Sequence, residues 1–135
     1  MGWTKTYEKT KKDVGMKIGF WNKGGALQPL HEKINEIEDI IKSNQFCVFG
    51  VVEANFFSIN NIEDVKISGF SILWDLGRSN TMRQNSRCVL FIRDDLSFKS
   101  RKDLMKDSIP EIWVEVGETH KKRTLICLFY REFSE

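Results

Sequence analysis

Residues 46–53 read FCVFGVVE, and this run decides the fold. From Phe46 to Val52 every residue except Gly50 is apolar, which is typical of a strand that is covered on both faces. A strand of that kind predicts a sheet with a helix packed against it. Glu53 ends the run, so an acidic side chain directly follows the predicted strand.

The segment before this run supplies the helix. Residues 16–21 (MKIGFW) form a short β-type run, and the sequence NKGG at 22–25 follows as a turn. Apolar residues then recur at helical spacing up to about Ser43, and they are Leu30, Ile34, Ile37 and Ile41. Strand, helix and strand in this order, with a connection long enough to cross over, predict a βαβ-like start.

After residue 60 the pattern changes to short β-type runs separated by polar turns. These runs cover residues 70–74, 88–93, 112–116 and 125–130. The expected fold class is therefore α/β (α+β), with a mixed sheet and one clear amphipathic helix. Residues 1–15 carry four lysines and no apolar periodicity, so we expect a flexible basic arm followed by a folded domain at 16–135.

Composition excludes several classes of protein. The chain has 135 residues, of which 41% are hydrophobic and 30% charged, which fits one folded domain. A net charge of +2 is too near neutral for overall charge to indicate a nucleic-acid partner. No apolar stretch approaches the ~18 residues that a membrane span needs. Three cysteines without metal-ligand spacing predict buried free thiols and an intracellular location, nuclear or cytoplasmic.

Local charge is more informative than net charge. Residues 78–102 hold seven basic residues against two acidic ones, whereas residues 32–64 hold seven acidic residues against two basic ones. The stretch RSNTMRQNSR at 78–87 combines arginines with amides, a pattern suited to contacts with phosphates. Its arginines are candidate nucleic-acid contacts, namely Arg78, Arg83 and Arg87. A merely solvated face is the alternative interpretation.

Polar residues also stand where three predicted strands stop. They are Asn22 after MKIGFW, Glu53 after FCVFGVV, and Tyr130 after LICLF. Polar residues at the ends of buried strands converge on one edge of a sheet, where a carboxylate can hold a divalent cation. The alternatives are a turn cap at Asn22, a solvated carboxylate at Glu53 and an interface aromatic at Tyr130.

In this order, these segments resemble the endonuclease/exonuclease/phosphatase superfamily, which includes deoxyribonuclease I and the apurinic/apyrimidinic endonucleases. MKIGFWNKGG looks like the opening strand of that superfamily, and FGVVEANFF looks like its second strand with the metal-binding Glu. Later segments resemble the endonuclease domain of LINE-type non-LTR retrotransposons. Those segments are GFSILWD, SRCVLFIRDDLSF, IPEIWVEV and RTLICLFYREFSE.

The resemblance implies a fold and a set of roles. The chain would form the N-terminal half of a four-layered α/β sandwich. Asn22 and Glu53 would hold Mg²⁺ as metal and catalytic residues, and Tyr130 would be a third catalytic residue that faces the scissile phosphate. Arg131 would contact nucleic acid beside it. The substrate would be DNA, cleaved by a magnesium-dependent endonuclease.

The sequence also departs from the superfamily. It contains neither the Asp-x-Asn motif nor the Ser-Asp-His motif of the second half, and Gly24 stands where many members carry an acidic residue. We therefore expect this chain to be a weak or inactive nuclease. A non-catalytic module that binds nucleic acid or protein is the alternative. Near-continuous apolar runs also predict an uncovered sheet face and self-association.

Overall fold

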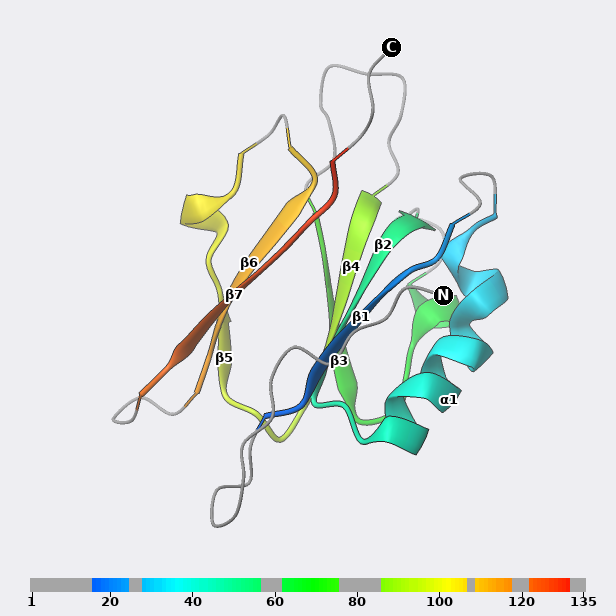
Figure 1. The fold of residues 1–135 in the computed structure, drawn as a ribbon, viewed down its shortest axis with the longest axis horizontal. Coiled ribbons are helices and arrows are strands. Elements are labelled where there is room, and N and C mark those ends of the chain that lie inside the picture. Colours follow the sequence, from blue (N-terminus) through cyan, green and yellow to red (C-terminus); the bar gives the residue numbers. More distant parts are fainter. Residues whose placement is uncertain are drawn as a thin grey trace.

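The computed structural model describes residues 16–24, 28–56, 62–75, 86–106, 109–117 and 122–131. Within them one α-helix and two β-sheets stack as three layers (Figure 1). The first sheet has the order β1 (Ile18–Asn22), β2 (Val48–Phe56), β4 (Ser86–Arg93), β3 (Phe70–Trp74). The second has the order β5 (Phe98–Ser100), β6 (Glu111–Val116), β7 (Thr124–Phe129). The helices are α1 (Ile34–Asn44) and the short 3₁₀ turns η1 (Leu30–Lys33), η2 (Glu63–Val65) and η3 (Lys102–Leu104).

The predicted βαβ start is confirmed, because β1 and β2 pair in parallel and α1 connects them. The predicted helix from Leu30 to Ser43 is divided in two, since its first turn is the 3₁₀ turn η1. α1 ends where Gln45 adopts a left-handed conformation with φ 57°. The N–H groups of Gln45 and Phe46 then cap the carbonyls of Lys42 and Ile41, which stops the helix one residue after the predicted end.

The first sheet is buried on both faces, as the apolar run in β2 predicts. Alternate side chains of β2, such as Phe49 and Val51, join the cluster under α1 that also contains Ile37 and Ile41. The intervening side chains, such as Val48, face the second sheet and join its cluster. The helix and the second sheet therefore cover opposite sides of the same strand.

Two glycines allow this close stacking. A Cβ at Gly19 would lie 2.6 Å from the ring of Phe46, so the absent side chain leaves the space that this ring fills against β1. A Cβ at Gly50 would lie 2.8 Å from the side chain of Leu128 on β7, so Gly50 lets the second sheet approach β2. Both glycines are required by space rather than by backbone conformation.

The prediction that the near-continuous apolar runs leave a sheet face uncovered is wrong for the first sheet. The runs around Phe49 and Leu90 are buried, because each face of the first sheet has a covering layer. The exposed apolar residues of β7 are Leu125 and Phe129, at 49% and 63% exposure. They lie on the side of β7 opposite Leu128, which packs inward. Self-association stays a prediction, and this outer side of β7 is the surface available for it.

Two further predictions concern the state of the cysteines and the presence of a membrane-spanning segment. The three cysteines carry free thiols, as predicted. Cys47 and Cys88 are buried, but Cys127 is half-buried, so the prediction of burial is wrong for Cys127. Burial raises the pKa of the Cys127 thiol to about 11. No helix in the part of the chain that the structure describes is long and apolar enough to cross a membrane.

We expect Gly19→Ala to destabilise the fold by about 1–3 kcal/mol, because the new methyl group would overlap the ring of Phe46. Chemical denaturation measures the loss. In a Phe46→Leu background the same substitution should cost less, since the smaller side chain leaves room for the methyl group. An equal cost in both backgrounds would contradict the steric explanation.

Candidate functional site

Three predicted site residues, Asn22, Glu53 and Tyr130, gather at the end of the first sheet where β1 finishes and β4 begins; we call this end the rim. The prediction that Glu53 directly follows its strand is wrong, because β2 continues through Glu53 to Phe56. Asn22 pairs with Val52, the residue before Glu53, in the parallel register of β1 and β2. The N–H of Lys23 donates to the carbonyl of Val52 at 3.1 Å and extends this pairing by one residue. The backbone therefore holds Asn22 beside Glu53, although 31 positions in sequence separate them.

An irregularity in β2 determines which way Glu53 faces. Val51 packs under α1 and Val52 packs toward the second sheet, so regular alternation would turn Glu53 toward the helix. Glu53 instead has φ 54°, and the register between β2 and β4 shifts after Val52. Its carboxylate consequently reaches a residue of the second sheet, while the next residue, Ala54, packs under the helix.

That residue is Tyr130, which follows β7. Its hydroxyl group donates a hydrogen bond to Oε1 of Glu53 at 3.1 Å, across 77 positions of sequence. The N–H of Tyr130 donates to the carbonyl of Pro110 at 3.0 Å, which continues the ladder between β6 and β7. The ring also packs against the cluster between the two sheets. The structure thus brings Glu53 and Tyr130 together as a hydrogen-bonded pair at the rim.

Asn22 occupies a more open position. Its side chain is exposed, and Oδ1 accepts a hydrogen bond from the N–H of Gly24 at 3.0 Å. Gly24 has φ 67°, a conformation that glycine adopts without strain. Asn22 therefore shapes the turn after β1, as the turn-cap alternative proposes, while its parallel register with Val52 places it on the side of the first sheet that faces β7.

Sequence reasoning missed the buried lysine beside Glu53. Lys23 is 9% exposed, and its Nζ donates to the carbonyls of Gln28 and Gly24. Burial lowers the pKa of Lys23, and the negative charge of Glu53 partly opposes that shift. The rim therefore contains a cationic group close to its carboxylate. The alternation of apolar and polar residues in the sequence did not indicate that Lys23 is buried, because a lysine after a strand usually extends into solvent.

A second acidic residue at this end was also missed. Asp75 follows β3 and is 2% exposed, and its Oδ1 accepts a hydrogen bond from the N–H of Cys88 at 2.7 Å. Its carbonyl accepts a hydrogen bond from the hydroxyl group of Ser86 at 2.9 Å. Asp75 thereby ties the end of β3 to the start of β4. The rule that singled out Glu53, a polar residue directly after a strand, would have found it.

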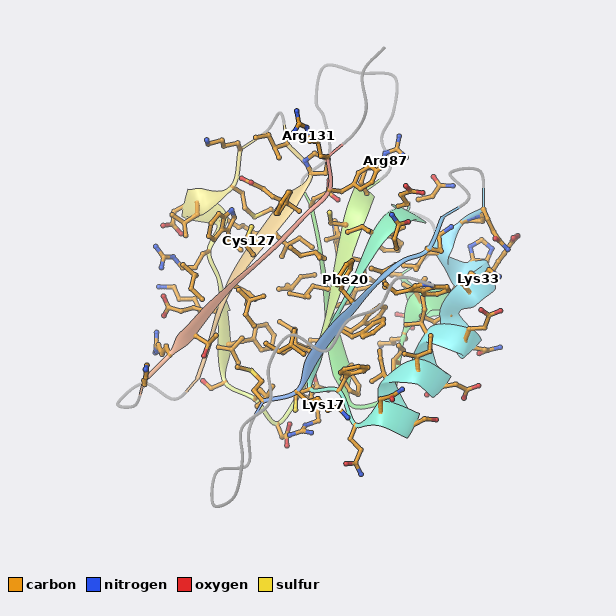
Figure 2. All side chains as sticks on the ribbon, in the orientation of Figure 1. Lys17, Phe20, Lys33, Arg87, Cys127 and Arg131 are labelled. Atoms are coloured by element: carbon orange, nitrogen blue, oxygen red, sulfur yellow. The ribbon has the colours of Figure 1, made fainter. Side chains whose placement is uncertain are left out.

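The candidate nucleic-acid residues are placed differently from one another. Arg78 and Arg83 lie outside the described residues. Arg87 was expected in a loop but belongs to β4 and is only 7% exposed, because the strand begins at Ser86. Arg131 is exposed just beyond Tyr130. Figure 2 shows Arg87 and Arg131 at the same end of the molecule.

The oxygen atoms at the rim are of the kind that Mg²⁺ binds in proteins. Mg²⁺ binds oxygen and commonly takes one or two carboxylates, with water and phosphate oxygens completing its shell. Glu53 provides one carboxylate, one oxygen of which already accepts from Tyr130, and Asn22 provides an amide oxygen. Among the described residues no three His, Cys, Asp or Glu side chains gather closely enough to hold a metal. Glu53 is thus the carboxylate through which a cation would bind, because the buried Asp75 already accepts a hydrogen bond from the N–H of Cys88.

The fold of this chain is similar to a fold found among solved structures. The two sheets and the helix correspond to part of an endonuclease fold of the retrotransposon type. One matching structure is the endonuclease domain of TRAS1, a telomere-specific non-LTR retrotransposon. The TM-score is 0.59 at 11% sequence identity, over 87% of this chain and 46% of that one.

The chain therefore spans about half the length of the solved domain that it matches. The sequence itself matches no protein-family model and no curated protein. The resemblance to retrotransposon endonucleases that the sequence motifs predict is confirmed at the level of the fold. The roles of individual residues stay predictions.

We expect Glu53→Gly to be more stable than Glu53→Ala by about 1 kcal/mol. At φ 54° alanine is strained by about 1–2 kcal/mol, whereas glycine is not. At Lys99, in a regular strand, the order should reverse, because glycine ordinarily costs about 0.5–1 kcal/mol relative to alanine. Thermal unfolding of the four variants measures both differences. If alanine were more stable than glycine at both positions, the backbone of Glu53 would be unstrained.

Proposed function

We propose that this chain provides one half of the active site of a magnesium-dependent DNA endonuclease. Glu53 holds the cation, Asn22 adds an amide oxygen, and Tyr130 with Arg131 positions a phosphate. The hydrogen bond between Tyr130 and Glu53 is the observation that supports this most directly. It joins a residue within β2 to the residue that follows β7, and the backbone of Glu53 adopts an unfavourable conformation to make it.

Strained backbone is informative here because it is costly. A non-glycine residue in the left-handed region costs of the order of 1–3 kcal/mol, and such residues concentrate at functional sites. Regular alternation would have turned the Glu53 carboxylate toward the apolar cluster under α1. The observed conformation instead presents it beside the phenolic hydroxyl group of Tyr130.

Each side chain would have a distinct task. Bound Mg²⁺ would polarise a phosphoryl oxygen and stabilise the leaving oxygen. Glu53 would supply the negative charge that retains the cation, and Tyr130 would orient that carboxylate through its hydrogen bond. The buried ammonium group of Lys23 lowers the net negative charge near the carboxylate, so cation affinity should be modest.

This half-site does not suffice for rapid cleavage. The matched domain is about twice as long as the matched region. Hydrolysis of a phosphodiester also needs a group that activates water, and losing such a group typically removes a factor of 10²–10⁴ in rate. The chain by itself should therefore bind the cation and DNA but cleave DNA poorly.

We expect the chain to bind Mn²⁺, used as a paramagnetic substitute for Mg²⁺, and Glu53→Gln to weaken this binding at least about tenfold. Tyr130→Phe should weaken it less, because the phenol positions the carboxylate without being required to bind the metal. Electron paramagnetic resonance measures free Mn²⁺ directly. Glu63→Gln is the matched control, since Glu63 is an exposed glutamate on η2.

Equal losses in Glu53→Gln and Glu63→Gln would rule out the metal site at the rim. If DNA bound without any saturable Mn²⁺ site, the alternative of a non-catalytic binding module would replace the proposal. Supercoiled plasmid incubated with the chain and Mg²⁺ should remain intact. Nicking that depends on Glu53 would show that this chain contains a more complete site than we propose.

We expect weak binding of double-stranded DNA that decreases steeply with salt, because contacts to phosphates release counterions. Arg131→Gln should reduce the affinity and lower the salt slope by about one. The matched control is Arg123→Gln, because Arg123 lies at the opposite end of the same strand and pairs with Glu115. Fluorescence anisotropy at several salt concentrations measures both effects. Identical effects would remove Arg131 from the proposed interface.

A further inference from the structure

A cavity of about 430 Å³ lies at the end of the first sheet opposite the rim. It opens between the last turn of α1, the start of β2 and the paired ends of β3 and β4. Figure 2 shows Lys17, one of its lining residues, far from Arg87 and Arg131. Along β2 the cavity and Glu53 are roughly 20 Å apart, at ~3.3 Å per residue. The cavity is thus separate from the proposed nuclease site.

Backbone hydrogen bonds fix the frame of this cavity. The N–H of Cys47 donates to the carbonyl of Lys17 at 2.8 Å, and the N–H of Arg93 donates to the carbonyl of Cys47 at 2.9 Å. Phe70 pairs with Arg93 in the register of β3 and β4. Four lining residues are therefore held by the sheet itself, so the site is preformed.

The charged side chains that line the cavity are all basic: Lys17, Lys42 and Arg93. Lys42 pairs with Glu38 at 2.8 Å, and Nε of Arg93 pairs with Asp95 at 2.5 Å. Lys17 has no ion pair among the described residues, and its Nζ lies 5.4 Å from the centre of the Phe46 ring. The ammonium group of Lys17 and the two terminal nitrogens of the Arg93 guanidinium thus remain as donors for an anion.

Three carbonyls near the C-terminus of α1 already accept hydrogen bonds. Unpaired carbonyls at the end of a helix would repel negative charge. The carbonyls of Ile41 and Lys42 accept hydrogen bonds from the backbone after the helix, and the carbonyl of Ile40 accepts one from the side chain of Asn44 at 2.8 Å. These hydrogen bonds therefore reduce the repulsion of an anion by the carbonyls at this end of the helix.

Apart from the amide of Gln45 and the thiol of Cys47, the rest of the lining is apolar. Ile41 and Phe46 are buried, and the half-buried Phe70 continues this surface at the start of β3. A ligand for this cavity must combine an apolar body with concentrated negative charge. The volume lies within the ~300–1,000 Å³ of ordinary small-molecule sites, so a whole small organic molecule fits, rather than a single ion.

We propose that this cavity binds a small organic phosphate with a flat ring, of the size of a mononucleotide. Arg93 and Lys17 bind the phosphate group, and the ring lies against the half-buried Phe70. An arginine presents paired donors that match phosphate oxygens, and a lysine adds a second charge. The site is independent of the cation and DNA contacts at the rim.

The test uses the full chain and adenosine 5′-monophosphate as the probe, with binding measured by calorimetry and by NMR shifts at the lining residues. Inorganic phosphate and adenosine serve as the two halves of the probe. We expect the nucleotide to bind more tightly than either half, with shifts at Lys17, Cys47 and Arg93. Absence of saturable nucleotide binding, or equal binding of inorganic phosphate, would overturn the proposal.

Variants separate the two parts of the site. Lys17→Gln and Arg93→Gln should each weaken nucleotide binding about fivefold to tenfold, since each removes a charged donor. Phe70→Leu should weaken nucleotide binding about threefold and leave phosphate binding unchanged. Lys99→Gln on β5 is the matched control, and thermal unfolding verifies that each variant folds. Equal effects of Lys17→Gln and Lys99→Gln would reduce the cavity to a general basic surface.

Discussion

Burial of β2 on both faces is the constraint on which the rest of the structure depends. From Val48 to Val52 each residue is buried, and the side chains alternate between the layer of α1 and the second sheet. Such a strand needs two covering layers, so the short chain must supply both a helix and a second sheet. Gly19 and Gly50 follow from the same need, because each removes a side chain where a neighbouring layer comes closest.

The rim shows how that constraint produces a polar site. After Val52 the regular alternation of β2 breaks, and the left-handed backbone of Glu53 turns the carboxylate out of the helix-facing cluster toward Tyr130. The hydrogen bond and the escape of a charged group from apolar surroundings offset the backbone strain. A site that connects two sheets in this way forms only when both sheets are in place. Its formation therefore depends on the packing of the whole fold.

Charged side chains gather at the two ends of the first sheet, although they are far apart in the sequence. At the rim one carboxylate and a buried lysine lie close together, and Arg131 is exposed beside them. At the opposite end Lys17, Lys42 and Arg93 surround an apolar cavity. These three bases come from different regions of the chain. The parallel pairing of β1 with β2 and the antiparallel pairing of β2 with β4 bring them together.

The sequence by itself determined the βαβ start and the strand-end positions of Asn22 and Tyr130, because hydrophobic periodicity is a local property that survives without tertiary contacts. Only the tertiary structure decided the direction of the Glu53 carboxylate. Glutamate has no preference for a left-handed backbone, and the partner that stabilises this conformation lies 77 positions away. Burial of Arg87 in β4 and the basic cavity likewise depend on which strands become neighbours, and strand pairing is set by packing between distant segments rather than by any local pattern.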